Sequence, residues 1–193
     1  MEVDLCYANL RKAVLSIFPV NEKSLKIFLD LFSFRKLQKD EYLSKSGDYP
    51  SHFAFICEGI IRSYYKNLGD DEIVNGIFID NYFVLPLPSF IFRKPAFLNF
   101  QAVKDTDIMQ IKFSDFEALS KGNPTLVKFM QSLIVREWIV KREMYESGIH
   151  VYNPKTRFNI LKDAIGNFIS SVPAKDIASY LRISEKQLLR YMR

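Results

Sequence analysis

The sequence has few of the residues that build reactive centres, with two cysteines and two histidines among 193 residues. Cys6 and Cys57 are too few for a disulfide framework or an iron–sulfur cluster, which favours a reducing, cytoplasmic location. His52 and His150 have no spacing to other ligand residues that is typical of a metal site. Glycine-rich phosphate loops and nucleophile elbows are missing as well. We therefore expect no enzyme activity, no catalytic residues, no metal and no cofactor.

Long apolar runs are missing too. No run reaches the roughly 18 residues that a membrane helix needs. The N-terminal stretch MEVDLCYANL is acidic and polar, unlike a secretory signal, and we expect no membrane association. Hydrophobic residues nevertheless make up 48% of the chain, including 17 Phe and 10 Tyr. This is enough apolar material for a core with packed rings.

The excess positive charge is confined to the end of the chain. The net charge is +5. Residues 154–193 hold eight Lys or Arg against three Asp or Glu, whereas residues 1–153 hold 19 of each sign. Such asymmetry is expected where a neutral sensor carries a module for a polyanion. A solvated basic face without a partner is the alternative, and charge alone does not choose between the two.

The hydrophobic periodicity changes along the chain. Residues 3–32 show helical spacing, which Pro19 interrupts. From about residue 34 to residue 113, short β-rich runs alternate with turn signals such as LGDDE, which favours an antiparallel sandwich or barrel. We expect an α+β fold in which residues 1–118 form a β domain with N-terminal helices.

A long helix is predicted next, from Pro124 to about Ser147. It has two apolar seams, of which one is sufficient to cover the β domain. Burial of the second seam by a twin helix would produce a two-fold homodimer through residues 124–147. Burial by the C-terminal segment is the alternative. We expect residues 119–150 to form the linker and dimerisation helix and residues 151–193 to form a C-terminal domain.

The final stretch, VPAKDIASYLRISEKQLLRYMR, predicts two short helices. Its apolar positions are spaced by 4, 2, 5 and 3 residues, and they are Ile177, Leu181, Ile183, Leu188 and Tyr191. One helix does not accommodate this spacing, whereas two helices that cross at a tight turn do. Ser184 is a suitable N-cap for the second helix, and Gln187 can complete a capping box with it. This is the helix-turn-helix pattern, in which the second helix lies in the major groove of DNA.

The polar side chains of this stretch suit DNA. Arg and Lys can donate to guanine, Gln can pair with adenine, and Glu can accept from cytosine. Other basic groups and helix ends suit phosphates. The candidate DNA-binding residues are Lys175, Ser184, Glu185, Lys186, Gln187, Arg190 and Arg193. Surface helices are routinely rich in such residues, so a plain structural hairpin remains an alternative.

Nearly the whole chain resembles a Crp/Fnr-type transcriptional regulator, of the shorter kind common in Bacteroidetes-like bacteria. The stretches YLSKSGDYPSHFAFICEGIIRSYY and FLNFQAVKDTDIMQIKFSDFEAL resemble the family's cyclic-nucleotide-binding-like jelly roll. YNPKTRFNIL resembles the join to its DNA-binding domain, and the final stretch resembles its helix-turn-helix. The resemblance implies a jelly-roll sensor, a homodimer joined through the long helix, and double-stranded DNA as the partner.

Three positions depart from the family pattern. The phosphate-binding Arg of cyclic-nucleotide members aligns near Ala96, with Arg93 three residues earlier, and their Gly-Glu pair is missing. We therefore expect no binding of cAMP or cGMP. Arg182 stands where the tight turn usually has Gly, because that position favours positive φ. Lys186 stands where the family often has Glu, so the operator preference should differ.

The sequence does not decide whether the sensor binds an effector or whether the C-terminal segment reads DNA. The candidate effector pocket consists of Phe83, Leu85, Phe90, Phe92, Arg93 and Phe97. A small apolar effector and a filled core without ligand are both compatible with these residues. The main hypothesis is a dimeric, sequence-specific DNA-binding regulator. The alternative is a ligand-binding or interaction protein whose degenerate tail no longer reads DNA.

Overall fold

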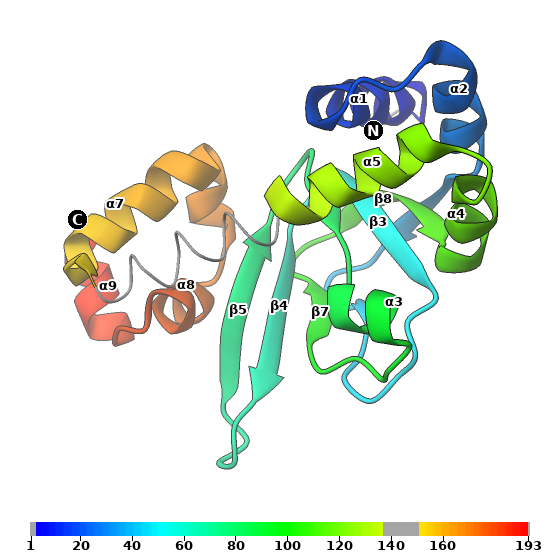
Figure 1. Ribbon diagram of the computed structural model, residues 1–193. Helices are drawn as coiled ribbons and strands as arrows, with labels where there is room; N and C mark the ends of the chain where they lie inside the picture. The colour runs from blue at the N-terminus through cyan, green and yellow to red at the C-terminus, as the bar shows by residue number, and fades with distance from the viewer. Residues whose placement is uncertain (1–2, 137–150, 193) are drawn as a thin grey trace.

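The structure, a computed structural model, describes residues 3–136 and 151–192 (Figure 1). It begins with two helices, α1 (Val3–Ile17) and α2 (Glu22–Asp30), which are separated near Pro19 as the sequence predicts. Asn21 caps α2, because its side chain accepts a 2.9 Å hydrogen bond from the amide of Ser24.

The next segment is a β roll of two antiparallel sheets. Its strands are β1 (Ser33–Leu37), β2 (Tyr42–Ser44), β3 (His52–Glu58), β4 (Ile61–Lys66), β5 (Glu72–Phe78), β6 (Phe83–Val84), β7 (Asn99–Ala102) and β8 (Thr106–Lys112). The strand orders are β1-β8-β3-β6 and β2-β7-β4-β5. Apolar side chains such as Ile56, Phe100 and Ile108 fill the space between the sheets. The predicted antiparallel sandwich is therefore confirmed.

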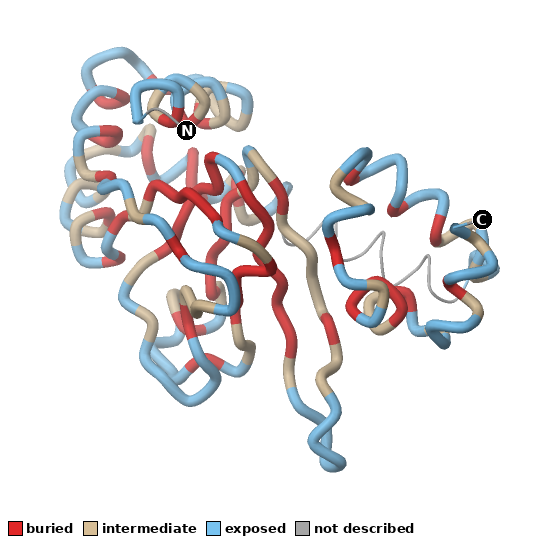
Figure 2. Tube along the Cα trace, turned by 180° about the vertical axis from the view of Figure 1, so that it is seen from behind, coloured by how far each residue is buried: buried red, intermediate tan, exposed pale blue. Residues whose placement is uncertain are grey.

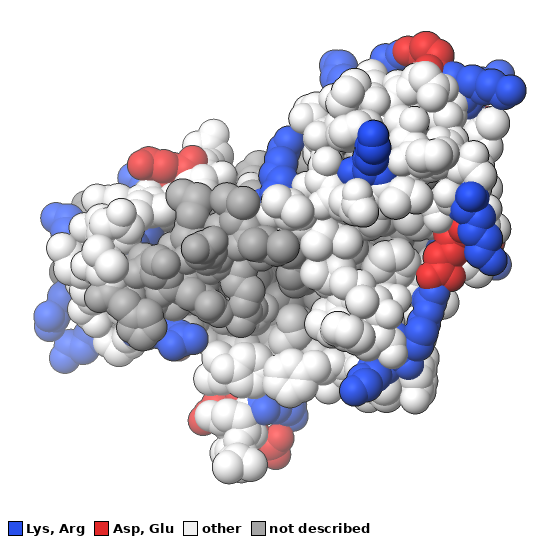
Figure 3. All heavy atoms as spheres, viewed as in Figure 1, with Lys and Arg blue, Asp and Glu red and all other residues white. Residues whose placement is uncertain are grey.

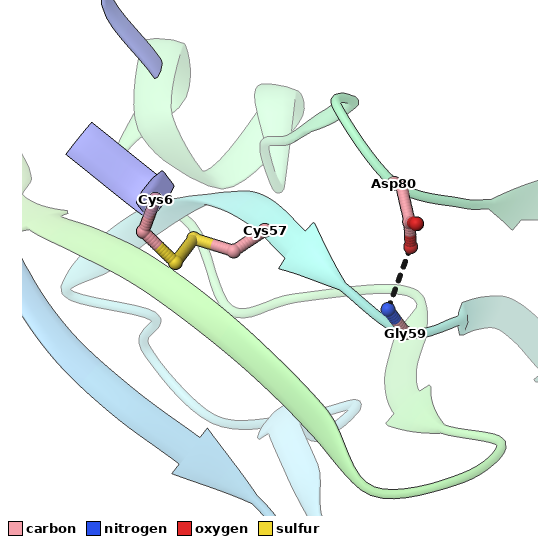
Figure 4. The surroundings of a disulfide bond; sticks show 4 residues. All are labelled: Cys6, Cys57, Gly59 and Asp80. Atoms are coloured by element: carbon pink, nitrogen blue, oxygen red, sulfur yellow. Dashed lines mark hydrogen bonds between the residues drawn. A yellow bond between two sulfur atoms is a disulfide. The ribbon is translucent and has the colours of Figure 1, made fainter. Parts of the chain in front are cut away.

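A glycine fixes the sharp turn from β3 to β4. Gly59 has φ +135, a region that L side chains rarely adopt. A Cβ atom there would lie 2.3 Å from the Thr106 hydroxyl oxygen. The Gly59 amide donates a 2.7 Å hydrogen bond to the carboxylate of Asp80, which ties this turn to the end of β5 (Figure 4).

Helices cover the outer face of the sheet that contains β3 and β8. They are α1, α2, α4 (Phe113–Ser120) and α5 (Pro124–Ile134), while the short α3 (Leu87–Phe92) lies between β6 and β7 in the chain. Aromatic rings fill this second core, in which Phe53 contacts Phe116 edge-on at 5.8 Å between centroids. The regular part of α5 ends at Ile134, and residues 137–147 of the predicted dimerisation helix lie outside the described residues.

A disulfide bond joins Cys6 of α1 to Cys57 of β3 (Figure 4). Their Cα atoms are 5.2 Å apart, and both residues are buried. The interpretation of these residues as two thiols, and of Cys57 as a small apolar side chain, is therefore wrong. The cause is the fold itself, because α1 packs across β3 and brings together two residues that are 51 positions apart.

The described residues after the gap form a C-terminal helical unit. It consists of α7 (Pro154–Ile165), the 3₁₀ helix η2 (Gly166–Ser171), α8 (Ala174–Leu181) and α9 (Glu185–Tyr191). These elements enclose an apolar cluster that includes Phe158, Ile177 and Leu188, and Ile60 of the β3–β4 turn belongs to the same cluster. Figure 1 shows α8 beside β5, and the two elements are in contact.

We predict that the disulfide contributes about 2–4 kcal/mol to the free energy of unfolding, because it closes a loop of 51 residues in the unfolded chain. Urea unfolding of the wild type with and without dithiothreitol should show this difference. Cys6→Ser should unfold like the reduced wild type and should not respond to dithiothreitol. An oxidised wild type that is no more stable than the reduced protein would contradict the prediction.

Candidate nucleic-acid interface

The turn between α8 and α9 depends on one residue in the left-handed region. Arg182 has φ 54 and ψ 50, the conformation expected for a position where Gly is usual. Its amide donates to the carbonyls of Ala178 and Ser179, and the next amide, of Ile183, donates to Ala178 at 3.0 Å. These bonds close the end of α8 and redirect the chain sharply into α9.

Local capping starts α9, and apolar packing fixes its inner face. The Ser184 hydroxyl accepts a 3.2 Å hydrogen bond from the amide of Gln187, which confirms the predicted N-cap. The Gln187 side chain does not close the capping box but donates to the Tyr191 hydroxyl at 2.9 Å. Leu188 is fully buried, and the Tyr191 ring lies 6.2 Å from the ring of Phe158 on α7.

The opposite face of this pair of helices is exposed and largely basic. Lys175, Glu185, Lys186 and Arg190 are all exposed. A shallow hollow of about 310 Å³ lies along α9 and is lined by Ser184, Lys186, Gln187, Arg190 and Tyr191. Figure 3 shows Lys and Arg side chains along the outer edge of the C-terminal helical unit. The arrangement can offer cationic donors and an amide to a groove edge. Arg193 lies outside the described residues.

The candidate effector residues are divided between the core and the surface. Phe83 and Leu85 are buried in the helix-covered core, and Phe90 is half-buried against it. Phe92 and Phe97 are 66% and 68% exposed. The structure thus does not bring these side chains together around one cavity. The sequence did not indicate this division, because a loop has no regular repeat from which the buried side chains could be predicted.

The region that would hold a cyclic phosphate is closed by backbone contacts. Ala96 is 5% exposed; its amide donates to Asp48 and its carbonyl accepts from Gly47, each at 2.8 Å. Arg93 is exposed and forms an ion pair with Glu117 of α4. A buried phosphate needs a positioned cation and free amides. Ala96 and Arg93 supply neither a positioned cation nor free amides here.

Residues 3–136 and 151–192 contain neither a metal site nor a membrane-spanning helix. Within that part of the chain, no group of three or more His, Cys, Asp or Glu side chains could hold a metal ion. Within the same part, no helix is both long and apolar enough to span a membrane.

Comparison with protein families matches residues 34–123 to the cyclic nucleotide-binding domain. No curated protein matches the chain. The matched segment contains every strand of the β roll except the first residue of β1, and it also contains the whole of α4. The β roll is therefore a cyclic nucleotide-binding fold.

Several solved structures share this fold. FixK2 from Bradyrhizobium japonicum is 15% identical, with a TM-score of 0.73 and coverage of 83% of this chain and 82% of that one. The c-di-GMP-responsive global regulator CLP from Xanthomonas campestris is 13% identical, with a TM-score of 0.68 and coverage of 89% and 90%. The cAMP-bound PfPKA-R is 16% identical, with a TM-score of 0.54, and this chain spans only 41% of it. At these identities the likeness shows the fold alone.

We predict that cAMP leaves the thermal midpoint unchanged, because the family resemblance aligns the phosphate-binding Arg near Ala96, which carries no charge. A ligand that binds only the native state raises the midpoint with its concentration. Differential scanning fluorimetry with millimolar cAMP tests this, and Arg93→Ala with the same ligand tests the cation three residues before Ala96. A rise in the wild type that Arg93→Ala abolishes would show that this loop does hold the phosphate.

Proposed function

We propose that this protein is a sequence-specific, DNA-binding transcriptional regulator that acts as a dimer. Its jelly-roll sensor does not bind cAMP or cGMP, and it carries a C-terminal helix-turn-helix of which α9 is the reading helix. The observation that carries the proposal is the placement of Lys186 and Arg190 on the exposed side of α9, opposite the buried Leu188.

The elbow at Arg182 supports the same proposal. A helix that enters a major groove must project from its domain, and the left-handed residue directs α9 away from α8. Lys186 and Arg190 then suit guanine edges, while Lys175 at the start of α8 suits a phosphate. The charge distribution agrees with this, because the excess of positive charge lies in residues 154–193.

Dimerisation and location belong to the same proposal. The α5 helix buries Leu126, Phe129 and Leu133 against the roll, whereas Val127 is 40% exposed and Val135 49% exposed. Val127 begins the second seam, which a twin helix would cover over residues 124–147. A regulator of genes acts where the DNA is, and on that ground we propose a cytoplasmic location; the Cys6–Cys57 disulfide removes the separate argument from reduced thiols.

A second candidate is a ligand-binding or interaction protein whose tail does not read DNA. The cAMP-bound PfPKA-R, with a TM-score of 0.54 over 58% of this chain, is a ligand-bound structure of the same fold and supports this candidate. The exposed Phe92 and Phe97 would then belong to an apolar effector or interaction surface.

The first prediction that separates the candidates concerns salt. Binding to duplex DNA should weaken steeply as salt rises, because each neutralised phosphate releases counterions. Fluorescence anisotropy on a mixed-sequence duplex between about 50 and 200 mM salt measures the slope. Weak binding with no salt dependence would favour the second candidate.

The second prediction concerns sequence reading. Arg190→Ala should weaken binding and relax the preference at one base pair by about 1–3 kcal/mol. Lys12→Ala on α1 is the control, since it removes an exposed charge far from α9 and should leave the preference unchanged. Binding selections with each variant measure the preference. An equal loss on all sequences would mean that Arg190 holds only phosphate.

A further inference from the structure

One buried cation joins the C-terminal helical unit to the β roll. Arg62 of β4 is 8% exposed and Asp176 of α8 is 3% exposed, and they lie 114 positions apart in the chain. Arg62 Nη1 donates to Asp176 Oδ1 at 2.7 Å. A charge pair this deeply buried is stable only when its geometry and its remaining hydrogen bonds are good.

The remaining bonds of Arg62 are made within its own sheet. Nη2 forms an ion pair with Glu72 Oε2 at 2.7 Å and donates to Gln101 Oε1, also at 2.7 Å. The guanidinium lies 4.4 Å from the centroid of the Tyr64 ring. Burial raises the pKa of Asp176. Burial by itself would lower the pKa of Arg62, but the negative charges of Asp176 and Glu72 outweigh it, and the pKa of Arg62 is raised. The sheet therefore presents a preoriented cation to α8.

A second tie lies next to this pair. The Ser179 hydroxyl accepts a 2.9 Å hydrogen bond from the Val74 amide and donates to the Glu72 carbonyl at 3.3 Å. Strand β5 is at the edge of its sheet, so α8 satisfies edge groups that a neighbouring strand would otherwise bond. Asp176 and Ser179 are three positions apart and share one face of α8.

The contact between α8 and the sheet leaves the basic face of the C-terminal helical unit exposed. Asp176 and Ser179 contact the sheet, whereas Lys186 and Arg190 are exposed on α9. A groove of about 720 Å³ separates Tyr65 and Ile73 of the β4–β5 hairpin from Arg182 and Gln187. In Figure 2 the tip of this hairpin is exposed beyond the helical unit. The docking contact thus fixes the angle of the helical unit without covering its outward side chains.

We propose that the Arg62–Asp176 pair, with Ser179, is a latch that holds the helical unit in its DNA-binding arrangement. This inference rests on the proposed function. Arg62 and Asp176 are positioning residues, because they act through α9 and do not touch DNA. Two reading helices of a dimer must match half-sites about 34 Å apart. A helical unit that is already held in place loses less conformational freedom on binding DNA than one that moves relative to the roll.

The test removes the negative charge of the first tie and the hydroxyl of the second with Asp176→Asn/Ser179→Ala, which nearly keeps the side-chain volumes and leaves the exposed face unchanged. Asp163→Asn is the matched control, since it removes one carboxylate from the exposed surface of α7 in the same unit. The DNA probe is a duplex that the wild type selects from a random-sequence pool. The dissociation constant of the unlatched variant should be about tenfold higher than that of the control, with the same dependence on salt.

Amide hydrogen exchange at Val74, measured by NMR without DNA, reports the latch directly. Exchange there should be faster in the unlatched variant than in the control, while amides of the inner strand β3 stay protected, which shows that the roll is folded. Ser179→Ala alone provides a milder variant if the double variant does not fold.

Three outcomes would overturn the inference. The unlatched variant could bind as tightly as the control or more tightly, which would make the contact neutral or inhibitory. Its salt dependence could become shallower, which would mean that a phosphate contact was lost. A wild type that selects no duplex would overturn the proposed function and the latch together. If the wild type does select a duplex, either of the first two outcomes would overturn the latch and leave the proposed function standing.

Discussion

A guanidinium buried between two parts of the chain determines how those parts are placed. Arg62 contacts Asp176, Glu72, Gln101 and Tyr64, and these partners come from α8, from the two neighbouring strands β5 and β7, and from its own strand β4. Removing a cation from water costs several kcal/mol, and only a complete set of partners offsets that cost. A nearly correct docking would leave a buried charge unpaired. The contact is therefore more selective for one arrangement than an apolar contact of the same area would be.

The C-terminal helical unit shows the opposite, local kind of constraint. Its elbow depends on the left-handed Arg182, on small Ala178 where the helices meet, and on the cap from Ser184. A non-glycine residue in that region is uncommon, and the bonds to the end of α8 hold it there. The Arg62–Asp176 pair thus fixes where the C-terminal helical unit lies on the roll. The local bonds at the turn fix which side chains of α9 face outward.

Local features could be predicted from the sequence, and long-range ones could not. The separation of α1 from α2, the antiparallel sheets, and the turn at Arg182 followed from spacing and turn chemistry within a few residues. The disulfide and the Arg62–Asp176 pair join residues 51 and 114 positions apart, so no local pattern indicates them. The division of the candidate effector residues between core and surface has a related cause, because the burial of Phe83 and the exposure of Phe97 depend on neighbours from other elements.

The bond between Cys6 and Cys57 closes a covalent ring around β1, β2 and the turn at residues 45–49, whose side chains are exposed. A protease that cut this turn would hydrolyse one peptide bond without releasing a fragment. The two pieces would migrate together on a non-reducing gel and separate only after reduction. An exposed loop of the roll is thus one whose cleavage leaves the chain in one piece.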